Sequence, residues 1–509
     1  MANELHFPLF HGYVDRWLVT ETPVITKPTA LHGAENEKLN TAPKDKPGEE
    51  QFKTERRAKA TAWPAQLDTR PGGLVGGADN VTPFTVYWPF DDIGVTYAWD
   101  CETPACLSAW AYTELDGAEA GSVPFDLITC GGAALWLNGE KLTEVTPYHH
   151  NEPVPTPLTL PLQKGRNKLL VFFDNYAERD ATIILRLRWK GEGAAPEQVI
   201  PVGEADAARL AEAEHLMRSL AFHRNHFTAG PVLLDYDGAD IAESYHLAFV
   251  GGTEENVKGG VLFRREADTL PHASQISLGD CKTFPLAFLL LQVTTEVEGI
   301  RLTRPISVEI HTESVLPRAL PTVAERKRQA LELLARWGEQ NTNRALAILA
   351  TGGDTAEAEK LLAVQSDYIR RRFDCSDFYL VYYPYILRTF GKRGSGILSE
   401  KTENELTDCL LGFRYWIDEP GNDAMWFWSE NHALMFHTCQ LLAGELFPDE
   451  VFTNSGLTGR QMQAKAKNML YDWFVTFRKE GFTEWNSSPY LPIDTLGFGS
   501  LYAFAQDPA

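Results

Sequence analysis

The chain has few basic residues for its acidic content. Lysine and arginine together number 47, against 69 aspartates and glutamates, so the formal net charge at pH 7 is −22. A protein with this charge repels a phosphate backbone and an anionic lipid surface. We therefore expect neither nucleic acid nor a membrane as a partner.

Long hydrophobic runs and a leader-like start are also missing. No stretch approaches the ~20 consecutive apolar residues that are needed to span a bilayer. The first residues, MANELHFPLFHGYVDRW, lack the basic stretch followed by an apolar one that marks a secretory signal. Together these two observations predict a cytoplasmic protein.

Cysteine is sparse and irregularly spaced, with seven residues in a chain of 509. This distribution fits buried, reduced thiols better than a disulfide framework. Cys101 and Cys106 form a lone C-x4-C pair, and His149 and His150 lie in a proline-flanked loop, so neither pair predicts a metal site. We expect no metal and no cofactor.

The short motifs of several enzyme classes are absent. The sequence contains no GxxxxGK[ST], GxGxxG, HExxH or GxSxG. These absences argue against a phosphate-binding loop, a dinucleotide fold, a zinc metalloprotease and an α/β-hydrolase. Any catalytic site must therefore be built from less familiar clusters.

The chain changes character along its length. Residues 33–60 are charged and nearly free of large apolar side chains, which predicts a solvated connector. Short strand-like runs between turns follow, and Asn138-Gly139 is a strong hairpin signal. The predicted domains are an N-terminal extension over residues 1–80, a sugar-binding-like β-sandwich over 81–200, a second β-rich domain over 201–320 and a helical domain over 321–509.

After Pro321 the hydrophobic period becomes helical. Helices that are apolar on every side alternate with amphipathic ones, and this predicts two concentric layers, an α/α toroid with a cavity inside its inner ring. Seven helices give an incomplete ring, so we expect a homo-oligomer or a missing C-terminal part to complete it. The predicted helices cover residues 323–340, 355–373, 379–390, 402–417, 426–437, 459–480 and 494–505.

Residues 426–437, WFWSENHALMFH, place a carboxylate, an amide and two imidazoles among large apolar side chains. On a helix that turns by ~100° per residue, Glu430 and His437 fall on one inward-facing stripe. A buried ionised carboxylate requires a partner or a wet cavity. Two interpretations stay open: Glu430 is paired with an arginine such as Arg372 or Arg414, or it lines a reactive pocket.

A second cluster follows a helix that ends in RKE. Residues 481–490, GFTEWNSSPY, carry Glu484, Trp485, Asn486 and Tyr490 within ten positions. Such a density of hydrogen-bonding groups suits a polyhydroxylated ring, because tryptophan covers its C–H face while the polar groups take its hydroxyls. The alternative is a capped loop with one exposed tryptophan.

Further candidates for substrate binding lie close to these two clusters. Asp374 and Asp377 precede an aromatic helix in the segment RRFDCSDFY. Trp428, Asn431 and His432 flank Glu430. Three polar clusters on the inner side of one toroid indicate a site more strongly than any of them alone.

The segments DCSDFY, WSENHALMFH, LFPDEVFTNSG and FTEWNSSPY resemble a family of largely uncharacterised bacterial proteins with toroid-type carbohydrate-active domains. The run ITCGGAALWLNGEKL resembles the sugar-binding sandwich of many glycosidases. The order of sandwich, linker and six-hairpin-like toroid is similar to that of inverting glycoside hydrolases and phosphorylases, whereas toroid-type polysaccharide lyases more often place the toroid first. The resemblance covers residues 82–190 and 370–505 and implies carbohydrate chemistry.

Three functions follow as expectations. In a glycoside hydrolase acting on an oligosaccharide, Glu430 would be the general acid and Glu484 the general base. In a polysaccharide lyase, Tyr490 or His437 would remove the proton next to a uronate carboxyl group, which Asn431 would neutralise. In a carbohydrate-binding protein without catalysis, the same pocket would bind a saccharide and leave it intact.

Overall fold

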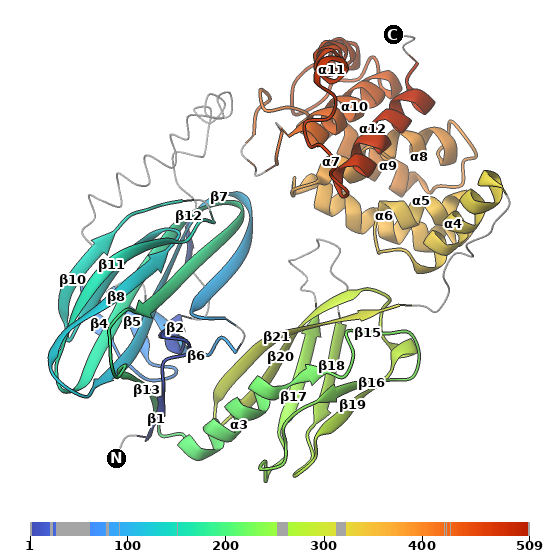
Figure 1. Cartoon of the computed structure of the whole chain (residues 1–509). Coiled ribbons are helices and arrows are strands. Elements are labelled where there is room, and N and C mark those ends of the chain that lie inside the picture. Colours follow the sequence, from blue (N-terminus) through green and yellow to red (C-terminus); the bar gives the residue numbers. More distant parts are fainter. Residues whose placement is uncertain are drawn as a thin grey trace. The chain divides into compact units, whose positions relative to one another are not determined.

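The computed structural model shows a β-rich unit that extends to His311 and a helical unit that contains the chain after it (Figure 1). The predicted connector over residues 33–60 lies outside the described part of the chain. The described residues are 3–20, 24–26, 62–77, 81–90, 92–149, 151–251, 263–311, 322–421, 423, 425–427 and 429–506.

The first part of the β-rich unit is a sheet of 13 described strands, with the order β10-β9-β12-β7-β2-β6-β5-β4 along its main path. The long strand β12 links the two halves of this sheet. It pairs with β9 near its beginning and with β8 at its end, so the sheet folds over itself. The Asn138-Gly139 turn joins β9 to β10, and both residues have positive φ, which confirms the predicted hairpin. The strands are β1 (Asn3–Phe7), β2 (Trp17–Thr20), β3 (Val24–Thr26), β4 (Gln66–Leu67), β5 (Leu74–Gly76), β6 (Val81–Tyr87), β7 (Val95–Gly117), β8 (Gly121–Thr129), β9 (Gly132–Leu137), β10 (Glu140–Val145), β11 (Val154–Leu162), β12 (Gly165–Trp189) and β13 (Glu197–Gly203).

The second part of the unit contains a three-stranded and a five-stranded sheet among the described residues. Its longest hairpin joins β20 to β21 through Glu298 and Gly299, both with positive φ. Side chains alternate between buried and exposed along β20, as expected for a strand with one face on a core. The elements are α3 (Ala207–Ser219), β14 (Ala221–Phe222), β15 (His226–Phe227), β16 (Pro231–Asp235), β17 (His246–Gly251), β18 (Phe263–Asp268), β19 (Gln275–Asp280), the 3₁₀ turn η2 (Cys281–Thr283), β20 (Phe288–Val297) and β21 (Ile300–Ile310).

The two β regions share one hydrophobic cluster. Tyr112 of the first sheet, Leu216 of α3 and Val293 of β20 all belong to it. A buried ion pair adds a polar link, because Arg16 before β2 contacts Glu214 of α3 at 2.9 Å. The division that the sequence predicts at residue 200 therefore marks a change of sheet within one core, and α3 was not predicted.

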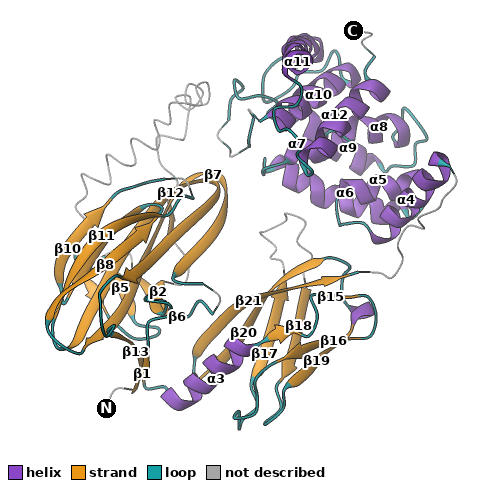
Figure 2. Cartoon of the chain, viewed as in Figure 1, coloured by secondary structure: helices purple, strands orange, loops and turns teal. Residues whose placement is uncertain are grey.

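The helical unit contains nine helices within residues 322–506 (Figure 2). The sequence predicts seven, because it misses α5 and merges the short α7 with α8. None of the helices in the described part of the chain has both the length and the apolar composition that a membrane span requires. The helices are α4 (Val323–Trp337), α5 (Thr342–Ala350), α6 (Thr355–Arg370), α7 (Ser376–Leu380), α8 (Tyr383–Phe390), α9 (Glu400–Gly412), α10 (Glu430–Leu446), α11 (Gly459–Glu480) and α12 (Tyr490–Phe504).

Helices α10 and α12 differ in how well their apolar sequences are covered. Helix α10 is buried along nearly its whole length. Helix α12 is more apolar, yet its fully buried residues are Asp494, Gly497 and Ser500, and Tyr502 is 96% exposed. One face of α12 therefore packs on the unit while much of its apolar surface stays in contact with solvent.

Candidate functional site

Helix α10 begins four residues later than the sequence predicts. Ser429 is its N-cap, with the Oγ atom accepting a hydrogen bond from the backbone N–H of His432. Trp426 therefore precedes the helix, and Glu430 is its first residue, where the positive end of the helix dipole favours a carboxylate. Trp428 lies outside the described residues.

Glu430 holds the loop between α11 and α12. Its Oε1 atom accepts a hydrogen bond from the backbone N–H of Thr483 at 2.9 Å, and its Oε2 atom accepts one from the N–H of Glu484 at 3.0 Å. The structure thus brings Glu430 and Glu484 together, as the sequence predicts. Because both oxygens accept backbone hydrogen bonds from the loop, the carboxylate of Glu430 holds the loop in place.

The arginines considered as partners of Glu430 pair elsewhere. Arg414 is buried and contacts Asp423 at 3.0 Å. Arg372 lies 3.8 Å from the same carboxylate and donates a hydrogen bond to Asn454. These pairs hold the segment that leads into α10, and no ion pair among the described residues involves Glu430.

Glu484 is half-buried and faces Asn431. The Nδ2 atom of Asn431 lies 3.3 and 3.2 Å from the two carboxylate oxygens, so the amide donates to this carboxylate. Asn431 itself is buried in the first turn of α10. The amide therefore fixes the orientation of Glu484 from a rigid helix. Asn431, which the sequence predicts to bind substrate, contacts this carboxylate.

Asp494 of α12 is the residue that sequence reasoning missed. Its side chain is buried, and its Oδ1 atom makes no hydrogen bond. Burial and, to a smaller extent, the negative charges of Glu430 and Glu484 together raise the pKa of Asp494 to about 7. The available signal was a single charged residue in the otherwise apolar segment YLPIDTLGFGSLYAF.

Gly497 allows α12 to approach α10 closely. A Cβ atom at this position would lie 2.8 Å from Cδ2 of Leu434 and 3.3 Å from Sδ of Met435. Asp494 lies one turn before Gly497 on the buried face of α12. Glu430 likewise lies one turn before Leu434 on α10. The close helix packing at the glycine therefore places Asp494 beside the carboxylates of the site.

Replacing Gly497 with Ala is expected to destabilise the helical unit by about 1–3 kcal/mol, because the added methyl group overpacks this contact. The matched control is Gly499→Ala in the same helix, where a Cβ atom meets nothing within 4 Å. Alanine there should stabilise the helix by about 0.5–1 kcal/mol. Thermal unfolding of both variants measures the difference, and equal midpoints would contradict the packing argument.

The loop after Glu484 presents its aromatic and polar residues to solvent. Trp485 is 86% exposed and Tyr490 is 39% exposed. Asn486 is also exposed and has a positive φ of 57°. An exposed indole beside two carboxylates can stack on a sugar ring without any rearrangement of the core.

His432, Asp374 and Asp377 form a separate buried cluster. The Nδ1 atom of His432 lies 2.9 Å from Oδ2 of Asp377, and its ring stacks on Phe378 with the centroids 4.6 Å apart. Burial raises the pKa of Asp377, and the nearby His432 opposes that rise. The Nε2 atom of His432 is 4.0 Å from Oδ1 of Asp374. The structure therefore brings these three predicted residues together in one cluster.

His437 packs in the interior of the helical unit. Its ring lies 4.3 Å from that of Trp416, and it is almost completely buried. Burial lowers the pKa of His437 to about 4, an effect that Gln440 partly opposes. The later helix start removes Trp426 from the predicted stripe, while Glu430 and His437 both lie on α10, seven residues apart and so on one side of it.

Stability should depend on pH through His437. The folded-state pKa of about 4 lies below the usual 6.5, so the contribution is fully present above pH 6.5 and is lost as the pH falls towards 4, by about 3 kcal/mol at most. The variant His437→Gln should show a smaller fall in unfolding temperature between pH 7 and pH 5. The exposed His246→Gln change is the control, and identical pH dependence in all three proteins would refute the assignment.

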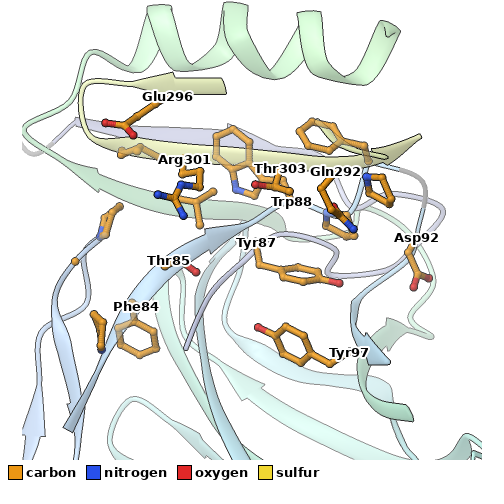
Figure 3. Close-up of a pocket in the computed structure, with 18 of the residues that line it drawn as sticks. Phe84, Thr85, Tyr87, Trp88, Asp92, Tyr97, Gln292, Glu296, Arg301 and Thr303 are labelled. Atoms are coloured by element: carbon orange, nitrogen blue, oxygen red, sulfur yellow. The ribbon is translucent and has the colours of Figure 1, made fainter. Parts of the chain in front are cut away.

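The β-rich unit contains a cavity of its own, with a volume of about 840 Å³. Figure 3 shows Tyr87, Trp88 and Tyr97 of the first sheet facing Gln292 and Arg301 of the β20–β21 hairpin. The Tyr87 and Tyr97 hydroxyl groups bond to backbone carbonyls, so their ring positions are fixed. The cavity therefore combines preset aromatic surfaces with polar side chains that can hydrogen-bond a ligand.

Comparisons with known proteins identify no family. No family model matches the chain, and no curated protein matches it. Among solved structures, the β-glucuronidase of Ruminococcus gnavus has 10% identity and a TM-score of 0.15, over 59% of this chain and 45% of that one. The β-glucuronidase of Parabacteroides merdae has 10% identity and a TM-score of 0.16, over 72% and 48%.

A further solved structure is described as an anti-sigma factor domain-containing protein. It has 11% identity and a TM-score of 0.17, over 47% of this chain and 94% of that one. The chain spans less than half the length of the two glucuronidases that it matches. Likenesses at these TM-scores carry no argument about activity, so the function has to be inferred from the site.

Proposed function

We propose that the helical unit is a glycoside hydrolase that cleaves an oligosaccharide by general acid–base catalysis. Asp494 is the acid, Glu484 is the base, and Glu430 positions the loop that carries Glu484. The observation that supports this most directly is the Asp494 carboxyl group, which is buried and has a pKa raised to about 7 beside two other carboxylates. Carboxyl groups whose environments push their pKa values apart are the usual basis of acid and base roles.

The acid role follows from protonation near neutral pH. A group with a pKa of about 7 is substantially protonated there, so it can transfer a proton to the leaving oxygen of a glycosidic bond. Glu484 is only half-buried, and Asn431 orients it. A carboxylate in this position can accept a proton from an attacking water molecule.

The exposed side chains around Glu484 support a saccharide as the substrate. Trp485 offers an indole face to a sugar ring, while Asn486 and Tyr490 provide hydrogen-bonding groups on the same exposed loop. Apolar rings beside polar groups are the combination that a polyhydroxylated ring requires. The proposal that the substrate is a saccharide therefore depends on these exposed side chains.

The lyase alternative has less support from this geometry. Asn431, its expected carboxyl-neutralising group, donates to Glu484 instead. His437, one expected base, is almost completely buried against Trp416. Tyr490 alone of the expected lyase residues is exposed on the loop.

The α/α toroid remains part of the proposal. The almost completely buried α10 has the character of an inner helix, and the partly covered apolar surface of α12 supports further helices packing there. A second copy of the chain or additional helices would supply them. Analytical ultracentrifugation, compared between the natural chain and Tyr502→Glu, distinguishes self-association from a monomer.

The experiment that tests the function is a turnover screen. The protein is incubated with neutral and uronic oligosaccharides, and new reducing ends are measured together with the ultraviolet absorbance of unsaturated products. Hydrolysis gives reducing ends alone, whereas elimination gives the absorbing product. Binding without either product would identify a non-catalytic carbohydrate-binding protein and overturn the proposal.

The cavity in the β-rich unit supports a second saccharide contact in the region that the sequence predicts as sugar-binding-like. Replacing the exposed Gln292 with Ala removes one polar group from its wall and none from the helical site. We expect weaker binding of a long oligosaccharide, measured by calorimetry, with unchanged turnover of a disaccharide. Unchanged binding of the long oligosaccharide would contradict a saccharide role for this cavity.

A further inference from the structure

Asp374, Cys375 and His432 place three different metal-binding side chains at one point of the helical unit. Their donor atoms, a carboxylate oxygen, the Sγ atom and a ring nitrogen, all lie within 4.8 Å of one another. The two neighbours come from the turn between α6 and α7, and the histidine comes from the first turn of α10. A sequence pattern could not show this grouping, because its ligands belong to two distant segments.

The histidine ring is oriented by groups on two sides. Its Nδ1 atom is held by Asp377 at 2.9 Å, and its face is stacked on Phe378. The opposite ring nitrogen, Nε2, lies on the side of Asp374, 4.0 Å from Oδ1. A carboxylate bound to one nitrogen of a metal-binding histidine is a recurrent arrangement, because it fixes the tautomer and directs the other nitrogen to the ion.

The backbone of the other two donors is also fixed. Cys375 has φ of 65°, in the left-handed region that residues other than glycine rarely adopt. The hydroxyl group of Tyr368 donates to the backbone carbonyl of Asp374 at 2.6 Å, and the hydroxyl group of Ser376 donates to that of Phe373. Such a conformation persists only where the surroundings hold it, and it is often found at functional sites.

We propose that Asp374, Cys375 and His432 bind Zn²⁺, with Asp377 as the carboxylate that positions the histidine. Zinc takes thiolate, imidazole and carboxylate ligands at about 2.0–2.3 Å. Tetrahedral ligands at those lengths are about 3.3–3.8 Å apart, so closing the cluster requires shifts of about 1 Å. Three protein ligands leave a fourth position for water or a substrate group.

The charge and donor types favour zinc over magnesium or calcium. A thiolate is a soft ligand that selects zinc over the hard cations, which prefer oxygen ligands alone. The cluster holds two carboxyl groups, one of them on the completely buried side chain of Asp377, so a divalent cation would offset negative charge in a poorly solvated place. The proposal is independent of the hydrolase assignment, since it involves neither Asp494 nor Glu484.

Cobalt replacement tests the site with a direct spectroscopic signal. Protein treated with a chelator is titrated with Co²⁺, and a thiolate ligand gives a sulfur-to-cobalt charge-transfer band in the near ultraviolet. We expect one equivalent of Co²⁺ to produce this band and one equivalent of Zn²⁺ to abolish it. Cys375→Ala should lose the band, whereas the control Cys281→Ala, which removes a buried thiol of the β-rich unit, should retain it.

A second variant guards against misfolding of Cys375→Ala. Asp374→Asn keeps the size of the side chain, so it should fold, retain the sulfur band and bind Co²⁺ at least tenfold more weakly. The natural chain should also unfold at a higher temperature with Zn²⁺ than without it. A natural chain without a charge-transfer band, or an equal band in Cys375→Ala, would show that the cluster is a structural ion pair and would overturn the proposal.

Discussion

The variant Asp494→Asn is expected to lose turnover by a factor of about 10²–10⁴, the usual contribution of a general acid. Asparagine keeps the size of the side chain and its polar character but cannot transfer the proton. Substrate affinity should change little, because the proposed contacts with sugar come from the loop around Glu484. The measurement is kcat and KM on the best substrate of the screen, with the exposed Asp449→Asn as the control.

The same variant should be more stable than the natural chain at alkaline pH. Because the folded-state pKa of Asp494 is about 7, above its usual value of 3.8, the folded chain incurs a growing cost as pH rises from about 4 to 7. This pKa shift corresponds to a loss of folding free energy of about 4 kcal/mol at most. Solvent screens the charges of the half-buried Glu430 and Glu484, which reduces the loss to about 1–3 kcal/mol. Asparagine carries no charge and avoids that cost.

The pairing of lost turnover with gained stability is therefore diagnostic. Thermal unfolding at pH 8 should show a higher midpoint for Asp494→Asn than for the natural chain, and at pH 4 the two should converge. The alkaline decline of kcat near pH 7 should also disappear. A variant that is less stable at pH 8 and still active would show that Asp494 is an ordinary structural residue.

Much of the β-rich unit could be predicted because its signals are local. Alternating side chains and the Asn138-Gly139 turn are properties of short segments, and both appear in the structure. The common core could not be predicted, because it depends on contacts between distant residues. Glu214 of α3 pairs with Arg16, and no local pattern reports a partner so far away along the chain.

The candidate site divides in the same way. Glu430 and Glu484 were predicted to meet, since both lie in dense polar clusters, and one hydrogen bond joins them at 3.0 Å. His437 lies on α10 seven residues after Glu430, but its ring packs on Trp416, a contact with a distant segment that the helical period does not show. Asp494 escaped notice because its importance arises from the close packing at Gly497, which a sequence does not display.

The variant Glu430→Gln separates a positioning role from an acid role. A glutamine has one acceptor oxygen where the carboxylate offers two to the N–H groups of Thr483 and Glu484, so one of these hydrogen bonds is lost. The loop should then shift, and a displacement on the order of 1 Å of a catalytic group lowers kcat by about 10²-fold. The loss should fall mainly on kcat.

The pH profile of this variant decides between the two roles. Removing the charge of Glu430 removes one of the two carboxylates that raise the pKa of Asp494, so that pKa must fall. The alkaline decline of kcat should therefore persist in Glu430→Gln and move to lower pH. If Glu430 were the acid instead, the decline would vanish in this variant and remain in Asp494→Asn, so the two profiles together exclude one assignment or the other.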